Sequence, residues 1–435
     1  MILRYLFFLF TPMLLIGCHY ERAFVFPDTG IEISKVESSF HVDYSMIEKN
    51  GNLYIAFYNS LHQMTLATVD SKTGKCEYEI LPSDIEWDSH NYVTMAFDKE
   101  GYLHVTGNMH AVPLVYFRSS EPYTIHGMKK INHMTGIDEN KVTYPIFMES
   151  PDGELIFHYR SGGSGNGFEI YNIYNVKEQK WRRLLDKPLI DGVGKRNAYM
   201  QGPILGANGY YHLIWVWRDT PDCSTNHTLS YARSKDLIQW ENVSGKKTNL
   251  PISFDKPDFY VDPTPVKGGL FNPGIKLGFD SNSYPIIGYH KYDEHGYNQL
   301  FVARYEKDGW YRKQLTNWDY RWQFEGPGSM KIELEIFTPK FIGEGKMLFG
   351  YKHVKEGSGE IIFDEKTFEI IGKREISSVY PEKYAQVESS YPGMQTHVIV
   401  VGDYLLRWET LPANRDQKIQ GPLPTPSRLM LYKWK

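Results

Sequence analysis

The chain has 435 residues, of which 15% are aromatic (32 Tyr, 23 Phe and 10 Trp) and 23% are charged. This composition excludes a disordered chain, a coiled coil and a collagen-like repeat. The 48 basic and 52 acidic residues leave a net charge of −4, so no basic excess supports nucleic-acid binding, and any anion-binding site must be local.

The N-terminal residues have the pattern of an export signal. Arg4 precedes an apolar run over residues 5–16, which is too short to cross a bilayer as a helix of the mature protein. The sequence Leu-Ile-Gly-Cys at residues 15–18 resembles a bacterial lipobox, whose cysteine becomes the lipidated first residue. We therefore expect a lipoprotein signal peptide over 1–17, a lipidated tether over 18–23 that starts at Cys18, and one folded domain over 24–435. An ordinary signal peptide with a chance cysteine is the alternative.

This N-terminal pattern also predicts where the protein acts. No later segment has eighteen uninterrupted apolar residues, so we expect a soluble body that an N-terminal lipid holds to a membrane. The protein would be an exported bacterial lipoprotein, in the periplasm or on the outer-membrane surface, and a monomer.

The rest of the chain consists of short apolar or alternating runs that Gly, Asp and Asn interrupt, which is typical of many β-strands. A strand–turn–strand unit recurs seven times, mostly at intervals of about 50 to 65 residues. The units span residues 42–58, 93–106, 144–159, 203–217, 275–289, 336–351 and 397–408.

Aromatic pairs follow several of these units and would close an outer hairpin: Tyr174 with Trp181, Tyr231 with Trp240, and Tyr305 with Trp310. Repeated four-stranded units of this size predict an all-β, seven-bladed β-propeller over residues 24–435, with antiparallel blades. The last strand, over residues 429–434, would close the ring beside the N-terminal strand. A pair of β-sandwiches is the alternative, but no linker separates two halves of the chain.

Cysteine content adds little. Besides Cys18 the chain has Cys76 and Cys223, whose spacing gives no support for a disulfide. Cys223 and His227 could be two metal ligands, but no further cysteine lies near them. We expect no required cofactor and no metal among the catalytic groups. A structural Ca²⁺ or Zn²⁺ ion remains open, although no loop matches a known calcium motif.

The propeller repeat predicts which side chains meet on one face. In each blade, the start of the innermost strand and the end of the second strand open on the same side of the central channel. The residues at these positions are mostly His, Tyr, Arg and Lys: His41, His90, Tyr144 and Tyr199 at strand starts, and Tyr58, His110, Arg160, Arg218, His290, Lys352 and Trp408 at strand ends. A cationic funnel rich in tyrosine fits an anionic substrate. The alternative is that these residues only hydrogen-bond to one another across the channel.

Several common hydrolytic sites are missing from this face. Glycoside hydrolysis normally needs two flanking carboxylates, and only Asp88, Asp219 and Glu409 come near it. The chain has no serine nucleophile elbow or HExxH motif, and no arginine triad of the sialidase type can be assembled. The glycine run over residues 162–167 opens no helix, so a loop beside Arg160 is a better interpretation than a phosphate loop.

The chemistry that fits these residues is β-elimination from a uronate. The proton at C5 becomes acidic once a cation neutralises the neighbouring carboxylate, and a base can then remove it. Tyrosine serves as this base only if nearby cations lower its pKa from about 10. Arg160, His90 and His110 could both neutralise the uronate carboxylate and lower the pKa of Tyr144.

Several motifs resemble the BNR-repeat propellers that include ulvan lyases. They are His-Asn-Tyr at 90–92, Gly-Tyr-Leu-His-Val at 101–105, Gly-Asn-Met-His at 107–110, Thr-Tyr-Pro at 143–145, Tyr-Arg at 159–160 and Trp-Arg-Asp-Thr-Pro at 217–221. The resemblance implies that His90, His110, Tyr144 and Arg160 are catalytic, with Arg160 neutralising the carboxylate. It also implies that Tyr199 lies nearby. Of the other residues on this face, we expect Arg218, His290 and Lys352 to bind substrate together with Tyr199.

Three functions remain open at this point. The first is a polysaccharide lyase that cleaves beside glucuronate or iduronate in an acidic polysaccharide such as ulvan. The second is an α-L-rhamnosidase acting on rhamnose–glucuronate units of arabinogalactan, because the same propeller type is similar to a family of such enzymes. That family uses one catalytic histidine on the opposite face, and the expected neighbourhood, residues 48–50, has none. The third is a glycan-binding propeller without catalytic activity.

Overall fold

A computed structural model describes residues 24–307 and 309–435, and it is built from β-strands. The only helical segments in these ranges are short 3₁₀ turns: η1 (Cys223–Thr225), η2 (Pro257–Phe259), η3 (Asn272–Gly274) and η4 (Glu382–Tyr384). None of them has the length and apolarity that crossing a membrane would require. The predicted signal peptide, Cys18 and the tether lie outside the described residues and stay predictions.

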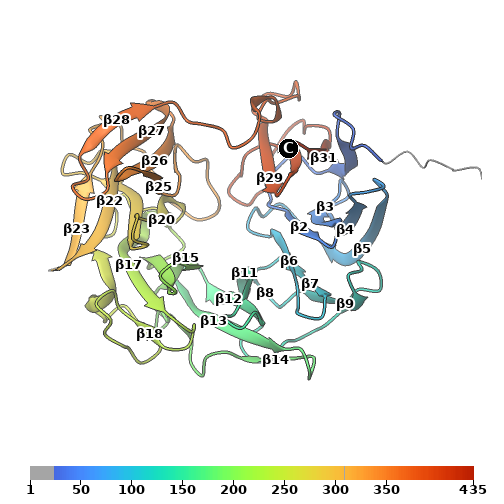
Figure 1. The fold of residues 1–435 in the computed structure, drawn as a ribbon, viewed down its shortest axis with the longest axis horizontal. Coiled ribbons are helices and arrows are strands. Elements are labelled where there is room, and N and C mark those ends of the chain that lie inside the picture. The colour runs from blue at the N-terminus through green and yellow to red at the C-terminus, as the bar shows by residue number, and fades with distance from the viewer. Residues whose placement is uncertain (1–23, 308) are drawn as a thin grey trace, which may run out of the picture.

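The sheets follow one another in chain order around the molecule (Figure 1). The first sheet has β2 (Ser45–Lys49), β3 (Asn52–Tyr58), β4 (Gln63–Asp70) and β5 (Cys76–Asp84). The second has β6 (Val93–Phe97), β7 (Tyr102–Gly107), β9 (Tyr116–Pro122) and β10 (Lys129–Lys130). The third has β8 (His110–Val112), β11 (Val142–Glu149), β12 (Leu155–Gly163), β13 (Asn166–Asn175) and β14 (Lys180–Arg183). The fourth has β15 (Asn197–Leu205), β16 (Tyr211–Arg218), β17 (Asn226–Ser234), β18 (Trp240–Glu241) and β19 (Tyr260–Asp262).

The next sheet has nine strands and divides into two antiparallel parts. The first part has β20 (Ile275–Phe279), β21 (Pro285–Tyr292), β22 (Asn298–Glu306) and β23 (Gly309–Gln314). The second has β24 (Leu334–Ile336), β25 (Lys340–Gly343), β26 (Lys346–His353), β27 (Gly357–Asp364) and β28 (Ile370–Arg374). One parallel contact, between Phe279 and Lys340, joins the parts. The prediction of an all-β propeller is confirmed, while the number of blades depends on whether this sheet is divided.

The last sheet joins the two ends of the described chain. It contains β29 (Gln395–Val401), β30 (Tyr404–Thr410), β31 (Ser427–Lys433) and the N-terminal strand β1 (Ile31–Val36). β1 pairs antiparallel with β31, as in the contact between Ile31 and Leu431. The predicted closure of the ring is therefore present, and it gives the last sheet strands from both ends of the chain.

Turn-forming residues in the sequence explain why neighbouring strands pair. Asp98, for example, accepts backbone N–H bonds from Glu100 and Tyr102, and Gly101 has φ +86°, a conformation that glycine adopts without strain. The predicted aromatic pairs Tyr174–Trp181 and Tyr305–Trp310 lie opposite each other on neighbouring strands. The third predicted hairpin, β17 with β18, is also present, but Trp240 lies opposite Ser234, and the ring of Tyr231 packs on Trp310 of the next sheet with centroids 5.4 Å apart.

The apolar core lies between neighbouring sheets. One buried cluster contains Phe57 of β3, Val93 of β6 and Leu431 of β31, so the first, second and last sheets share a core. Full burial of each large apolar side chain contributes about 1.5–3 kcal/mol. This packing fixes the inner strands, at whose ends the polar residues of the central face are placed.

Candidate active site

A pocket of about 580 Å³ lies where several sheets meet, and five of the predicted residues line it: His90, His110, Tyr144, Tyr199 and Arg218. Another wall of the pocket comes from two loops far along the chain, residues 325–328 and 415–417. A larger hollow, of about 940 Å³, lies beside β23 and is lined by Tyr305, Trp310 and Tyr311. The site is therefore identified by its chemistry and not by its size.

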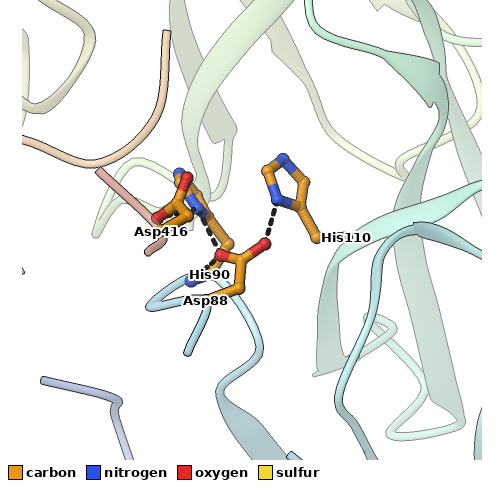
Figure 2. Close-up of side chains that lie close together, drawn as sticks. All are labelled: Asp88, His90, His110 and Asp416. Atoms are coloured by element: carbon orange, nitrogen blue, oxygen red, sulfur yellow. Dashed lines mark hydrogen bonds and ion pairs between the residues drawn. The ribbon is translucent and has the colours of Figure 1, made fainter. Parts of the chain in front are cut away.

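Two histidines of the pocket share one carboxylate, that of Asp88 (Figure 2). Asp88 precedes β6, and its Oδ1 accepts from the backbone N–H of His90 and, at 2.8 Å, from His90 Nδ1. Its Oδ2 lies 2.5 Å from Nδ1 of His110, the first residue of β8. Because both Nδ1 atoms face Asp88, the Nε2 atoms are the ones left for a ligand.

A second carboxylate, from Asp416, reaches His90 from the loop between β30 and β31. Its Oδ1 lies 3.3 Å from His90 Nδ1 and accepts a hydrogen bond from the Ser329 hydroxyl. Although burial opposes the charge on His90, the bonds to Asp416 and Asp88 raise its pKa to about 9. His90 is therefore an imidazolium cation at neutral pH.

The same cluster has the composition of a metal site. Asp88, His90, His110 and Asp416 offer ligand atoms that all lie within 4.8 Å of one another. Two imidazoles and two carboxylates are a set that a divalent transition metal accepts. The hydrogen bonds described above account for the arrangement without an ion.

Tyr144 enters the pocket through an irregularity of β11. Between Thr143 and Ile146 this strand has one residue more than β12 opposite it, which is a β-bulge. Tyr144 has φ +56°, a conformation that is rare for an aromatic residue and carries strain. Its ring lies 5.9 Å from that of His90. The bulge therefore directs the Tyr144 side chain into the pocket, and the strained backbone at this residue is the cost of that orientation.

Arg160 lies behind the pocket wall and not on it. Its side chain is 1% exposed, and none of its three guanidinium nitrogens has a hydrogen-bond partner among the described residues. The guanidinium carbon lies 5.0 Å from the ring centre of Tyr144 and 5.6 Å from that of Tyr199. The expectation that Arg160 grips a carboxylate directly therefore finds no support in this geometry. Its closest partners are the two tyrosines.

Tyr199 is held more firmly than Tyr144. Its hydroxyl lies 2.7 Å from the Ser164 hydroxyl and accepts a bond of 3.2 Å from Nη1 of Arg218. Although burial opposes its ionisation, the charges of Arg160 and Arg218 lower the pKa of Tyr199 below its ordinary value of about 10. Burial and the neighbouring Tyr199 raise the pKa of Tyr144 well above that value. The pKa values of the two tyrosines therefore differ, and Tyr199 is the more easily ionised of the two.

The glycine run after Arg160 forms the tip of the β12–β13 hairpin. A Cβ atom on Gly167 would lie 3.1 Å from two side-chain carbons of Arg160, and one on Gly165 would lie 2.6 Å from the backbone of Thr220. Glycine is therefore required for two close approaches, one against Arg160 and one against the loop after Arg218.

Two predicted substrate-binding residues lie away from the pocket lining. His290 is fully buried and packs near Trp322, with ring centres 5.9 Å apart. Lys352 forms an ion pair with Glu335 at 3.2 Å. Strand-end position alone did not show that His290 faces the core, or that Lys352, whose side chain is about half exposed, lies outside the pocket. Cys223 packs on Met330, whereas His227 contacts Asp219, so the proposed pair of metal ligands does not converge.

The sequence did not indicate the wall formed by residues 325–328 and 415–417. Asp416 and Arg415 lie in an irregular loop that matches no repeat position, and only their polarity could have drawn attention to them. The sequence places Asp88 near this face but does not indicate that its carboxylate binds both histidines.

Comparisons with known proteins agree on one group. The family model described as "BNR repeat-containing family member" matches residues 52–318. The chain is 31% identical over 151 residues to the short isoform of an ulvan lyase from Alteromonas sp. (strain LOR), covering 30% of this chain and 29% of that protein. It is 20% identical over 249 residues to Ulvan Lyase-PL25 from Pseudoalteromonas sp. (strain PLSV), covering 49% and 50%. The matched segments thus span half or less of these curated relatives.

Solved structures extend the likeness to the whole fold. The crystal structure of polysaccharide lyase Uly1 superposes with a TM-score of 0.61 at 15% identity, covering 90% of each chain. A PL25 ulvan lyase bound to -[GlcA(1-4)Rha3S]- gives 0.57 at 12% identity, covering 92% of this chain and 95% of that one. At these identities the likeness concerns the fold alone.

Proposed function

The chain belongs to the BNR repeat-containing family, and we propose that it is a polysaccharide lyase that cleaves beside a uronate by β-elimination, with ulvan as the first candidate substrate. The observation that carries this proposal is the pair Tyr144 and Tyr199 over the buried Arg160, beside the cationic ring of His90. It supplies a cation for a carboxylate, a candidate base and a candidate acid in one pocket.

The first requirement is to neutralise the uronate carboxylate. His90 lines the pocket, is charged at neutral pH, and has its Nε2 side available for a ligand. A charge-assisted hydrogen bond from this ring would stabilise the carboxylate most strongly as negative charge develops on it during loss of the C5 proton. In this scheme His90 neutralises the uronate carboxylate, the role that the sequence analysis expects of Arg160.

The second requirement is a base and an acid with different pKa values. Tyr199 has the lowered pKa and would remove the C5 proton as a phenolate, which Arg160 and Arg218 stabilise. Tyr144 stays protonated and would donate its hydroxyl proton to the glycosidic oxygen as that bond to C4 breaks. The products would be a 4,5-unsaturated uronate and a sugar with a new hydroxyl group, and a later proton transfer from Tyr199 to Tyr144 would restore the starting state.

The pH dependence of this scheme follows from His90. As pH rises through about 9, His90 loses its proton and with it the cation that neutralises the carboxylate, so kcat/KM should fall. In Asp88→Asn one of the two supporting carboxylates is gone, so the pKa of His90 falls and the alkaline limb should move to lower pH. In the wild type, the contribution of His90 to folding stability is present below about pH 6.5 and lost as pH rises to about 9. A pH–rate profile measures the shift.

Asp152→Asn is the matched control for Asp88→Asn. Asp152 is an exposed carboxylate in the turn between β11 and β12, away from the pocket lining. Its substitution should leave the alkaline limb in place. An alkaline limb in Asp88→Asn that coincides with that of the wild type would remove His90 from the mechanism.

The product distinguishes the proposed function from the alternatives. The full chain is incubated with ulvan and, separately, with gum arabic arabinogalactan, and each sample is followed by ultraviolet absorbance and by chromatography of free rhamnose. We expect absorbance from an unsaturated uronate on ulvan. Free rhamnose without absorbance would establish a rhamnosidase instead, and binding of ulvan without either product would establish a glycan-binding protein.

A further inference from the structure

The pocket contains a second cationic group that the elimination does not use. Arg415 lines the pocket from the loop between β30 and β31. Its Nη1 donates to the backbone oxygens of Glu325 and Pro327, at 2.9 and 3.0 Å. These bonds occupy one nitrogen and leave Nη2 and Nε of the guanidinium for another acceptor.

The surrounding loop is shaped to hold this arginine. A Cβ atom on Gly328 would lie 2.8 Å from the backbone oxygen of Arg415, and one on Gly326 would lie 3.4 Å from its Nη1. Both glycines have positive φ, +78° and +84°, which disfavours larger residues at either position, and at Gly328 the close approach of the Arg415 backbone disfavours them as well. The two hydrogen bonds from Nη1 restrain the guanidinium, which lowers the entropic cost of binding a ligand.

No carboxylate neutralises Arg415 within the described ranges. None of the ion pairs includes it, and the Asp416 carboxylate beside it is engaged by His90 and Ser329. Glu325 is the other carboxylate of the pocket; it is exposed and forms no ion pair there, and it contributes only its backbone oxygen to Arg415. Arg415 is exposed and lines the pocket, and an arginine there without an acidic partner fits an anionic ligand.

We propose that Arg415 forms a second anion-binding subsite, which recognises a sulfate ester on a sugar adjoining the uronate at His90. Asp416, the next residue along the chain, contacts His90, so the two cationic groups lie on one continuous stretch of the pocket wall. The planar guanidinium donates two parallel hydrogen bonds to two oxygens of one anion, a geometry that sulfate esters offer. This inference rests on the proposed function, because it assigns the carboxylate to His90.

Binding without turnover tests the subsite. In the full chain carrying Tyr144→Phe, titration calorimetry measures the affinity for ulvan oligosaccharides before and after chemical desulfation. We expect the sulfated form to bind about fivefold more tightly, the upper range for an exposed ion pair. Adding Arg415→Gln should bring the ratio close to one while the affinity for the desulfated form changes little. Arg182→Gln, an exposed arginine on the outer strand β14, is the matched control and should keep the ratio.

The outcomes of these measurements test the Arg415 subsite separately from the proposed function. A ratio that Arg415→Gln leaves unchanged would overturn the subsite while the proposed function stands. Carboxyl-reduced oligosaccharides provide the other arm: if Arg415→Gln weakens the binding of native oligosaccharides but not of carboxyl-reduced ones, Arg415 binds the uronate and the assignment to sulfate fails. No binding of any form would overturn the proposed function, and the subsite with it. Thermal unfolding of each variant shows that it is folded.

Discussion

Replacing Tyr144 by phenylalanine should slow elimination by a factor of about 10²–10⁴, the usual contribution of a general acid or base. The variant keeps the aromatic ring at φ +56° and the contact with Arg160, so the pocket should stay intact and substrate affinity should change little. Only the hydroxyl proton is lost. The measurement is the initial rate of absorbance increase on the uronate polymer, with binding measured separately by calorimetry.

A substrate with a good leaving group separates the acid from the base. If Tyr144 protonates the departing oxygen, a uronide with an aryl ether at C4 needs no such proton and should restore most of the rate of Tyr144→Phe. The same substrate should not restore Tyr199→Phe, because the C5 proton must still be removed. If this substrate restored only Tyr199→Phe, Tyr199 would be the acid and Tyr144 the base.

An ordinary tyrosine provides the control for these two variants. Tyr284 is 58% exposed in the turn before β21, and Tyr284→Phe should leave the rate unchanged. Full activity of Tyr144→Phe on the natural substrate would show that the strained tyrosine is not a catalytic residue.

The second large effect is expected at Arg160, where activity and stability should change in opposite directions. Arg160→Met removes a charge that is 1% exposed and has no hydrogen-bond partner in the described part of the chain. A buried charge without a hydrogen-bond partner carries a desolvation cost, and an apolar side chain of similar volume does not. The thermal midpoint should therefore stay or rise, although the rate at neutral pH should fall by about 10²–10³, as for loss of one electrostatic stabiliser.

The pH profile of Arg160→Met identifies the cause of its low rate. Without the guanidinium the pKa of Tyr199 rises, so the acidic limb of the profile should move to higher pH, and part of the lost rate should return as pH increases. Arg182→Met, on the outer strand β14, should change neither limb. A lower thermal midpoint with an unshifted profile would mean that Arg160 supports the fold and not the chemistry.

Local sequence signals predicted the sheets well because each depends on neighbours along the chain. The turn around Asp98 and Gly101 is one example, since its hydrogen bonds join residues two to four apart. Tyr231 illustrates the limit: its partner Trp310 belongs to the next sheet, and no periodicity within one unit identifies a contact between units.

The sequence predicted the part of the candidate site that the repeated strands form, but not the part that the loops form. Repeat position placed His90, His110, Tyr144, Tyr199 and Arg218 on one face, and all five line the pocket. Strand alternation could not predict that Arg160 lies beneath two rings, because the bulge at Tyr144 alters the alternation of β11. Asp416 reaches His90 from a loop near the other end of the chain, and nothing local to either residue encodes that contact.

The pairing of β1 with β31 has a consequence for synthesis of the protein. Arg415 and Asp416 lie in the loop that joins β30 to β31, so both ends of this loop are held only when the final strand has docked against β1. A nascent chain emerging from the ribosome could already contain the tyrosines and Arg160 but would still lack the wall that this loop helps to form. Completion of the fold and competence for catalysis would then arrive together, and a partly made chain would have no working pocket.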